Sequence, residues 1–425
     1  KVIKCGSEAT YVGISRVVWP DAGSKRVTVT TEIKPVSEWA PDPKVEEIVH
    51  RRMEVVRELD NAPLFVWDGE SILTSKDNRI QETTLSTKLV STLRDALGCD
   101  CCVLNAGNIR GNKDYPKGYK FFTYNDLKSE IPFDCEMIVV PMPGLILSEA
   151  IAHSREKSLM KPPVSTGGYL HMDDGMQFDH ATKRLVKCAG KAFDPDRIYQ
   201  VGALFMAMTG VDQNTPLVTF TDSNPHLFPI DKSNEMGRPA KLLLVDYMSK
   251  AIWYQLGGFD SIDADEKGYL TAQDIRKAIE KHFSRSVGDI VVSNMLATAD
   301  VNSDGQVSRE EMLRVTMINA SARREMDADG SGTLDRDEVR NFVRRVISTN
   351  EDEVQRLVDL VFAEHHVEGD DAHIEQSHVL SFVQRSFQID GVNMPGHKKD
   401  RSEITAAKSQ LANKQAKTSA SNLTP

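Results

Sequence analysis

The sequence predicts an α+β protein, in which a mixed α/β region is followed by an all-helical region. In residues 1–37 apolar and polar side chains alternate, as Val27 and Val29 do with their neighbours, and a two-residue period is typical of β-strands. From about residue 245 to 388, short acidic loops with a central glycine separate helical segments. Residues 391–425 contain few apolar side chains and are expected to form a disordered tail.

Helices and a buried strand are predicted in order along the mixed region. Apolar residues recur at helical spacing between Val45 and Leu59, and leucines four residues apart predict a second helix at 83–97. Gly98 follows that helix, at a position where glycine commonly ends one. The short apolar run Cys101–Leu104 predicts a buried strand, and the polar residues 105–112 predict a loop at its end.

Length and composition exclude several classes of protein. A chain of 425 residues predicts two or three domains, and 40% hydrophobic with 27% charged residues is typical of a globular protein. The net charge of −10 argues against non-specific nucleic-acid binding, and no apolar run is long enough for a transmembrane helix. The six cysteines have no regular spacing, which favours scattered thiols over a disulfide framework. Because the first residue is Lys1 and not Met, the chain is expected to be a fragment or a processed product, and the compartment is left open.

Two of the acidic loops have the spacing that a calcium-binding loop needs. Such a loop supplies oxygen ligands at positions 1, 3, 5, 7, 9 and 12, with glycine at position 6 and a bidentate carboxylate at position 12. Residues 300–311 and 327–338 meet these requirements and resemble the loops of EF-hand proteins, so Ca²⁺ is the expected cofactor. The expected ligands are Asp300, Asn302, Asp304, Gln306, Ser308 and Glu311 in the first loop, and Asp327, Asp329, Ser331, Thr333, Asp335 and Glu338 in the second.

Two further loops depart from this pattern. Residues 263–274 supply the ligand positions Asp263, Asp265, Tyr269 and Asp274, but Lys267 stands where an oxygen ligand is needed, so weak binding or none is expected. The unit at about 367–378 has His378 at position 12 and is expected to be a structural partner. Position 8 is apolar in all four loops, which predicts that the loops pack together in two pairs; these residues are Leu270, Val307, Leu334 and Ile374.

The region before these loops resembles the C-terminal, substrate-binding domain of 5′-nucleotidases. Residues 104–110, Leu-Asn-Ala-Gly-Asn-Ile-Arg, are similar to the family motif Asn-x-Gly-Gly-Ile-Arg. Ile131-Pro132-Phe133 resembles a segment ending in Leu-Pro-Phe, and Pro143-Gly144 begins an expected helix at 145–155. Gly167-Gly168 and the segment Tyr199–Asp212 resemble later parts of the same domain, in the same order.

The resemblance implies a site for a nucleoside monophosphate or a nucleoside. Arg79 and Arg110 would contact phosphate or ribose, for which the planar guanidinium is well suited. Asn105 and Asp212 would hydrogen-bond the nucleoside, and Phe133 would stack on the base.

Three positions depart from the family pattern at this site. The second stacking phenylalanine of the family aligns with Met206, although Phe205 is adjacent and a one-residue slip would bring it into the site. Asn108 replaces the second glycine of Gly-Gly-Ile-Arg, and Gly-Gly-Asp-Gly has become Gly210-Val211-Asp212-Gln213. Base recognition is therefore expected to be weakened or altered.

In this family the chemistry belongs to a separate domain with a pair of divalent metals. No Asn-His dipeptide occurs in the chain, and the ligand motifs of that centre are missing. Residues 1–37 are interpreted as the end of that domain, 38–240 as the substrate-binding domain and 245–388 as the EF-hand domain. The parent protein is then expected to be a calcium-binding nucleotide phosphohydrolase. The alternative is a non-catalytic Ca²⁺ sensor or interaction protein that carries a relic nucleotidase domain, and whether Ca²⁺ is regulatory or structural stays open.

Overall fold

The protein is described from a computed structural model. It describes residue 4 and residues 9–386, except 22, 24, 68–69, 120, 229–236, 318–325, 329–330, 332, 349, 366, 368 and 370–371. The predicted tail at 391–425 lies outside these residues. The chain divides into two compact units between Glu58 and Leu59, whereas the sequence set the first domain boundary at residue 37.

The first unit contains a β-hairpin and most of a helix. Strands β1 (Tyr11–Val18) and β2 (Thr28–Pro35) pair antiparallel from Tyr11 opposite Pro35 to Val18 opposite Thr28, as the alternating pattern predicted. The 3₁₀ turn η1 (Val36–Glu38) and helix α1 (Pro43–Asp60) follow. Nearly every side chain of the hairpin is exposed, including Trp19 at 60%.

A five-stranded sheet organises the second unit, in the order β12-β6-β11-β4-β7. The strands are β12 (Arg238–Pro239), β6 (Glu136–Pro143), β11 (Ile198–Leu204), β4 (Cys101–Asn105) and β7 (Leu170–Met172). Strand β4 runs parallel to β11, and the other neighbouring pairs are antiparallel. All five residues of β4 are buried, which agrees with the apolar run predicted there.

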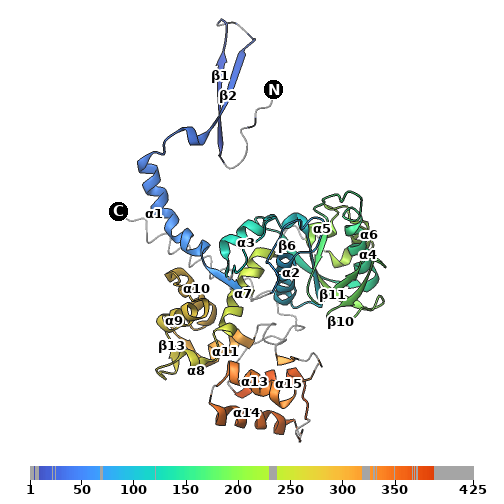
Figure 1. The fold of residues 1–425 in the computed structure, drawn as a ribbon, viewed down its shortest axis with the longest axis vertical. Helices are drawn as coiled ribbons and strands as arrows, with labels where there is room; N and C mark the ends of the chain where they lie inside the picture. Colours follow the sequence, from blue (N-terminus) through green and yellow to red (C-terminus); the bar gives the residue numbers. More distant parts are fainter. Residues whose placement is uncertain are drawn as a thin grey trace. The chain divides into compact units, whose positions relative to one another are not determined.

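Helices and smaller sheets complete the mixed α/β region (Figure 1). The helices are α2 (Thr84–Leu97), α3 (Tyr124–Glu130), α4 (Gly144–Arg155), α5 (Phe205–Met208), α6 (Thr215–Ser223) and α7 (Ala240–Gln255), with 3₁₀ turns η2 (Ala106–Asn108) and η3 (Pro225–Leu227). Strands β3 (Pro63–Val66) and β5 (Phe121–Thr123) form one pair, and β8 (Gln177–Asp179), β9 (Arg184–Cys188) and β10 (Lys191–Ala192) form a three-stranded sheet.

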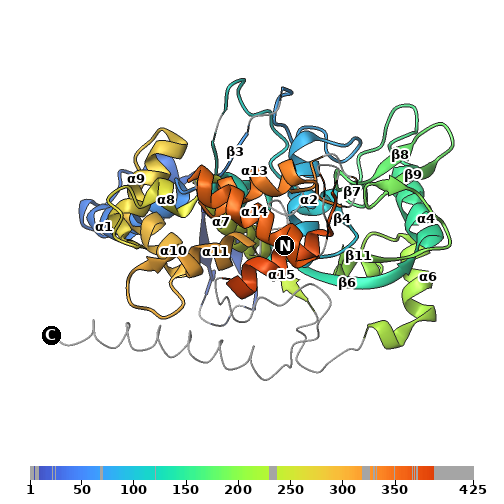
Figure 2. The same cartoon turned by 90° about the horizontal axis from the view of Figure 1, so that it is seen from below.

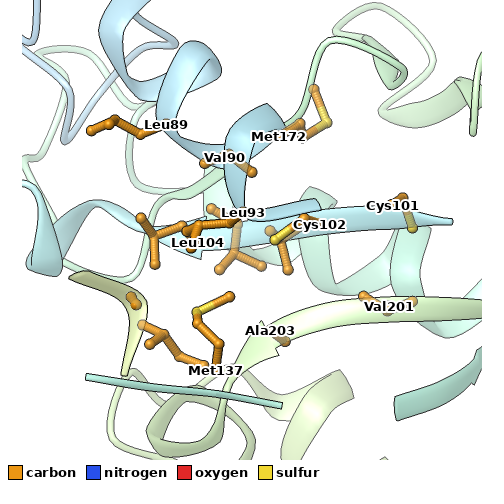
Figure 3. Close-up of a cluster of buried hydrophobic side chains, with 14 of the residues drawn as sticks. Leu89, Val90, Leu93, Cys101, Cys102, Leu104, Met137, Met172, Val201 and Ala203 are labelled. Atoms are coloured by element: carbon orange, nitrogen blue, oxygen red, sulfur yellow. The ribbon is translucent and has the colours of Figure 1, made fainter. Parts of the chain in front are cut away.

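Helix α2 covers one face of the central sheet. Thr83 caps the start of the helix by accepting a hydrogen bond from the amide of Ser86, and Gly98 ends it in the left-handed conformation at φ 65°. Its apolar side packs on β4 and β11 (Figure 3). Burial of such apolar surface stabilises the fold by roughly 25 cal/mol per Å². The buried side chains there include Leu89, Leu93, Cys102, Leu104, Val201 and Ala203.

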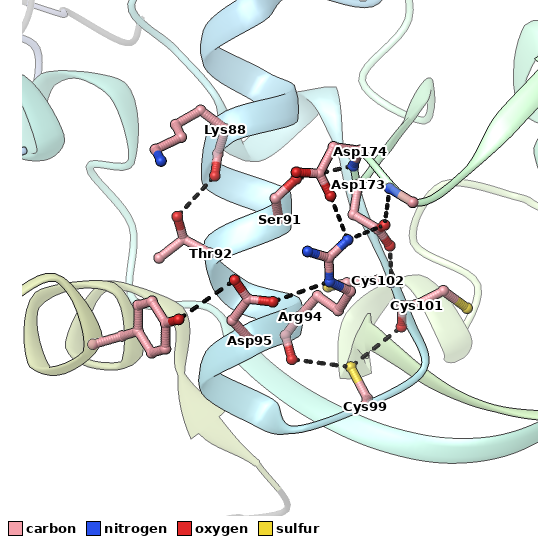
Figure 4. Close-up of polar contacts among 12 residues, drawn as sticks. Lys88, Ser91, Thr92, Arg94, Asp95, Cys99, Cys101, Cys102, Asp173 and Asp174 are labelled. Carbon is pink, nitrogen blue, oxygen red and sulfur yellow. Dashed lines mark hydrogen bonds and ion pairs between the residues drawn. The ribbon is translucent and has the colours of Figure 1, made fainter. Parts of the chain in front are cut away.

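A buried ion-pair network ties α2 to the segment that follows β7 (Figure 4). Arg94 donates to Asp173 at 2.6 Å, to Asp174 at 2.5 Å and to Asp95 at 3.1 Å. Asp173 also accepts the backbone amides of Cys102 at 2.7 Å and Gly175 at 2.8 Å. Burial raises the pKa of Asp173, although Arg94 opposes that shift.

The last part of the second unit is helical. Its elements are α8 (Phe259–Ile262), β13 (Tyr269–Leu270), α9 (Ala272–Phe283), α10 (Asp289–Ala299), β14 (Val307–Ser308), α11 (Arg309–Met317), α13 (Arg336–Val346), α14 (Glu351–Glu364) and α15 (Gln376–Ser386). Figure 2 draws these helices in yellow to red. The predicted fold class, a mixed region followed by helices, is confirmed. None of the described helices has the length and apolar content that crossing a membrane requires.

Helix α7 joins the mixed region to both groups of helices. Leu244 and Met248 are buried in the core of the mixed region. Ile252 and Trp253 belong to a second core that contains α9 and α10, and Tyr254 belongs to a third core with α13 and α14. One continuous helix therefore contributes side chains to all three cores of this unit.

Candidate functional site

The loop after strand β4 brings two predicted residues together. Asn105, the last residue of the strand, is 7% exposed and donates from Nδ2 to Oδ2 of Asp212 at 2.5 Å. Asn108, which replaces a glycine of the family motif, donates to Oδ1 of Asn105. Asp212 thus lies against Asn105, at the carboxyl end of the buried strand β4.

Two glycines allow this close approach. The amide of Gly107 donates to the carbonyl of Gly167 at 2.8 Å. A Cβ atom on Gly168 would lie 3.1 Å from Cβ of Asp212 and 3.4 Å from its carbonyl oxygen, which is closer than most Cβ contacts. Gly167-Gly168 therefore provides the space in which the Asn105 and Asp212 loops meet.

Arg79 and Arg110 line one cavity of about 500 Å³, together with Asn78 and Asn112. The guanidinium carbon of Arg110 lies 5.1 Å from the centre of the Phe133 ring, and this ring is 47% exposed. Within the described part of the chain, neither arginine forms an ion pair with a carboxylate. The two predicted cations and the predicted stacking ring thus lie close together at the surface.

Glu130 holds the loop of Arg110 in place, and this role was not predicted from the sequence. Its carboxylate is fully buried and accepts hydrogen bonds from Ser75 at 3.0 Å, Tyr115 at 2.8 Å and the amide of Gly111 at 3.1 Å. Its carbonyl accepts the amide of Arg110 at 2.8 Å. Burial raises the pKa of Glu130 above its usual value. No pattern in the sequence points to this role, because a glutamate at a helix end is ordinarily solvated.

The second predicted aromatic, Phe205, is half-buried and packs against the domain core. Met206 beside it is 51% exposed. Asp212 lines another cavity, of about 350 Å³, with Gly168, His153 and Lys157. At the position of the family's second stacking ring, the more accessible side chain is therefore the methionine.

The loop at 300–311 is folded around its own carboxylates. Oε1 of Glu311, at position 12, accepts the amides of Val301 at 2.8 Å and Asn302 at 3.3 Å, so the end of the loop reaches back to its beginning. Asp300 accepts the amides of Asp304 at 3.1 Å and Gly305 at 2.9 Å, and Gly305 has φ 83°. These are hard oxygen donors on one short loop, a set that suits Ca²⁺.

The loop at 327–338 is closed in the same way. Oε1 of Glu338 accepts the amide of Ala328 at 2.7 Å, and Asp335 with Glu338 forms a capping box at the start of α13. Asp329, a predicted ligand, lies outside the described residues. Among the described residues, no group of three His, Cys, Asp or Glu side chains is gathered as a metal cluster would need.

Comparison with known proteins identifies the domains. The family described as 5′-nucleotidase, C-terminal domain, matches residues 61–214. The EF-hand domain pair matches residues 257–317, and the EF hand matches 324–343. The chain carries a 5′-nucleotidase C-terminal domain followed by EF-hand domains. The predicted resemblance is confirmed.

Solved structures with some likeness share only low identity. The NAD nucleotidase of Haemophilus influenzae is 17% identical with a TM-score of 0.37, over 49% of this chain and 39% of its own. The 5′-nucleotidase precursor of Thermus thermophilus is 17% identical with a TM-score of 0.34, over 56% of this chain and 46% of its own. A homolog of programmed cell death 6 protein from Leishmania major is 16% identical with a TM-score of 0.13, over 39% of this chain and 90% of its own.

The chain therefore spans less than half the length of the two nucleotidases. No curated protein matches it.

The EF-hands are arranged in two pairs, as the apolar residues at position 8 predicted. Strand β13 of the first loop pairs antiparallel with β14 of the second, with Leu270 opposite Val307. Leu334 and Ile374 exchange backbone hydrogen bonds of 2.7 and 3.0 Å between the third and fourth loops. All four side chains are buried, so each pair shares one apolar contact across its loops.

The first EF-hand loop contains a positively charged side chain, that of Lys267, among its acidic ones. The ammonium of Lys267 lies 2.5 and 2.6 Å from the two carboxylate oxygens of Asp265 and 3.1 Å from Oδ2 of Asp274. The hydrogen bond between them raises the pKa of Lys267 and lowers that of Asp265. The lysine thus joins loop positions 3 and 12, which calcium joins in a filled loop.

Replacing Lys267 by aspartate is expected to create a third calcium site. The change removes the internal cation and supplies a carboxylate at position 5, while Asp274 at position 12 limits affinity to roughly 10⁻⁵–10⁻⁴ M. Calorimetric titration should show a stoichiometry one higher than in the unchanged chain. Lys277→Asp, an exposed substitution with the same charge change, is the control. A folded Lys267→Asp variant with unchanged stoichiometry would show that the lysine is not what blocks this loop.

Proposed function

We propose that the nucleotidase domain binds a nucleoside monophosphate beside Arg110 and Phe133, while the EF-hand loops 300–311 and 327–338 bind Ca²⁺. The observation that carries the first part is the position of Arg110, 5.1 Å from an exposed aromatic ring and on the same cavity as Arg79. Two guanidinium groups without a carboxylate partner among the described residues attract a phosphate dianion. A base would stack on the Phe133 ring, and the Asn105–Asp212 pair would bind the ribose hydroxyls.

In the parent protein, we propose that a two-metal centre hydrolyses the phosphate ester of the bound nucleotide. Such a centre stabilises the attacking and the leaving oxygens of the displacement. The residues of this chain would bind and orient the nucleotide, and they would not carry the hydrolysis. The interpretation of residues 1–37 as the end of the metal-binding domain remains part of this proposal.

Isothermal titration with AMP and with adenosine tests the nucleotide site. Arg110→Ala is expected to weaken AMP binding by about 10- to 100-fold, since a charged hydrogen bond contributes about 1.5–3 kcal/mol. The same change should affect adenosine little, because adenosine lacks the phosphate. Phe133→Ala should weaken both ligands to a similar extent, by about 1–3 kcal/mol for lost stacking.

Arg184→Ala, an exposed arginine on strand β9, serves as the control and should change neither affinity. Equal loss of AMP and adenosine on Arg110→Ala would rule out a phosphate contact. Binding of neither ligand to the unchanged chain would remove the nucleotide site from the proposal.

Two observations favour the second candidate function, a Ca²⁺ sensor with a relic nucleotidase domain. Met206, and not an aromatic ring, is exposed at the second stacking position, and Asn108 uses its amide on Asn105. Calcium binding without any nucleotide binding in the same titrations is the result expected for this alternative.

A further inference from the structure

The two loops proposed to bind Ca²⁺ lie in different EF-hand pairs. Loop 300–311 pairs with loop 263–274, and loop 327–338 pairs with loop 367–378. Each partner loop departs from the ligand pattern, because Lys267 stands at a ligand position of the one and a histidine ends the other. Contact across a loop pair therefore does not join the two calcium sites, and any coupling between them has to cross from one pair to the other.

Arg309 makes such a crossing. It stands at position 10 of its calcium loop and is the first residue of α11. Its Nη1 donates to the carbonyl oxygen of Ile347 at 2.7 Å, and its Nη2 forms an ion pair with the carboxylate of Asp260 on α8. Ile347 is the C-cap of α13, and α13 begins inside loop 327–338. A side chain of one calcium loop is thus bonded to the far end of the helix that leaves the other.

The packing around this bond is close. A Cβ atom on Gly258 would lie 3.2 Å from the carbonyl oxygen of Arg345, near the end of α13. The guanidinium carbon of Arg345 lies 4.3 Å from the centre of the Tyr254 ring on α7. Helix α11 contributes the buried Met312 to the core that contains α9 and α10, and the buried Leu313 to the core of α13 and α14. The helix that follows loop 300–311 is therefore packed into both EF-hand pairs.

The contact at Ile347 lies at the negative end of a helix. The last carbonyl groups of an α-helix have no partner within it, and a cation beside them stabilises the helix. Ca²⁺ held by Ser308 and Glu311 would fix the backbone on both sides of Arg309, so less conformational entropy is lost when Arg309 bonds Ile347. The helix stabilised in this way carries Glu338, the position-12 ligand of the other loop, in its first turn.

We propose that Ca²⁺ binding at loop 300–311 raises the calcium affinity of loop 327–338 through Arg309. This inference rests on the calcium binding proposed above for both loops and adds the coupling between them. Because coupling between two binding sites is reciprocal, Ca²⁺ at loop 327–338 raises the affinity of loop 300–311 by the same factor.

Calorimetric titrations of the full chain with Ca²⁺, after bound calcium has been removed, measure this factor. Glu311→Gln and Glu338→Gln each leave one working loop, so they give the affinity of each site alone. The coupling factor is the product of the two stepwise affinities of the unchanged chain divided by the product of these two single-site affinities. It is expected to be about five or more.

Three further variants test the route of the coupling. Arg309→Met, introduced into all three chains, should bring the factor to about one, because methionine neither donates to Ile347 nor pairs with Asp260. Asp260→Asn, outside both calcium loops, should lower the factor as well. Lys277→Met is the matched control, since it removes a positive charge at an exposed position of α9 and should leave the factor unchanged.

A factor near one or below in the unchanged chain would overturn the proposal, and so would an unchanged factor in a folded Arg309→Met variant. Should circular dichroism show that Arg309→Met does not fold, an unchanged factor in Asp260→Asn overturns it instead. Two independent sites would remove the coupling alone, whereas a chain that binds no Ca²⁺ would remove the calcium sites and the coupling together.

Discussion

Replacing Glu311 by glutamine is expected to remove one of two strong calcium sites, and Glu338→Gln is expected to remove the other. Position 12 of an EF-hand loop supplies a bidentate carboxylate, and an amide offers one neutral oxygen in its place. In the structure the Glu311 carboxylate already reaches the amides of Val301 and Asn302, so it lies at the closing point of the loop. Loss of affinity of about 100-fold or more, or about 2.7 kcal/mol, follows for the altered loop.

Calorimetric titration after removal of calcium with EGTA measures this directly. The stoichiometry should fall from two to one in each single variant and to zero in the double variant. Glu310→Gln is the matched control, because Glu310 precedes Glu311 on the same helix and its side chain is exposed. A stoichiometry that stays at two in Glu311→Gln would contradict the assignment of loop 300–311.

Asp173→Ala is expected to give the largest loss of stability, about 3–5 kcal/mol, which is typical when one partner of a buried ion pair is removed. The carboxylate is fully buried and accepts Arg94 and the amides of Cys102 and Gly175. Its removal leaves these buried donors with fewer acceptors. Since domains are stable by only about 5–15 kcal/mol, this is a large fraction of the total.

Urea unfolding followed by circular dichroism, with EGTA present, gives the change in midpoint. Asp174→Ala is the matched control, because Asp174 also binds Arg94 but its side chain is 60% exposed. An exposed ion pair contributes about 0–1 kcal/mol, so the control should unfold near the unchanged protein. Similar midpoints for the two variants would mean that burial does not set the strength of this network.

Most of the correct fold predictions came from the spacing of apolar residues that are close in sequence. The α2 helix was predicted from leucines four residues apart, and Gly98 ends it as expected. The apolar run at 101–104 is the fully buried strand β4. Elements of this kind depend on residues that are neighbours in sequence, so a single sequence contains the whole signal.

The sequence grouped the residues of the proposed nucleotide site but not the residues that support them. Asn105 contacts Asp212, and Arg110 contacts Phe133, which brings together residues that only the resemblance had grouped. Their binding roles stay predictions. No pattern in the sequence predicted that Glu130 supports the loop of Arg110. The choice between Phe205 and Met206 depends on which side chain of α5 faces the core, and the sequence alone does not give this.

The sequence by itself determined the calcium loops and the family of the domain before them, because an EF-hand loop draws its ligands from twelve consecutive residues. Only the tertiary structure decided that Lys267 bridges Asp265 and Asp274, and that Glu130 is buried under the arginine loop. The physical reason is that charge and burial depend on groups from distant segments, and folding alone determines which of them meet.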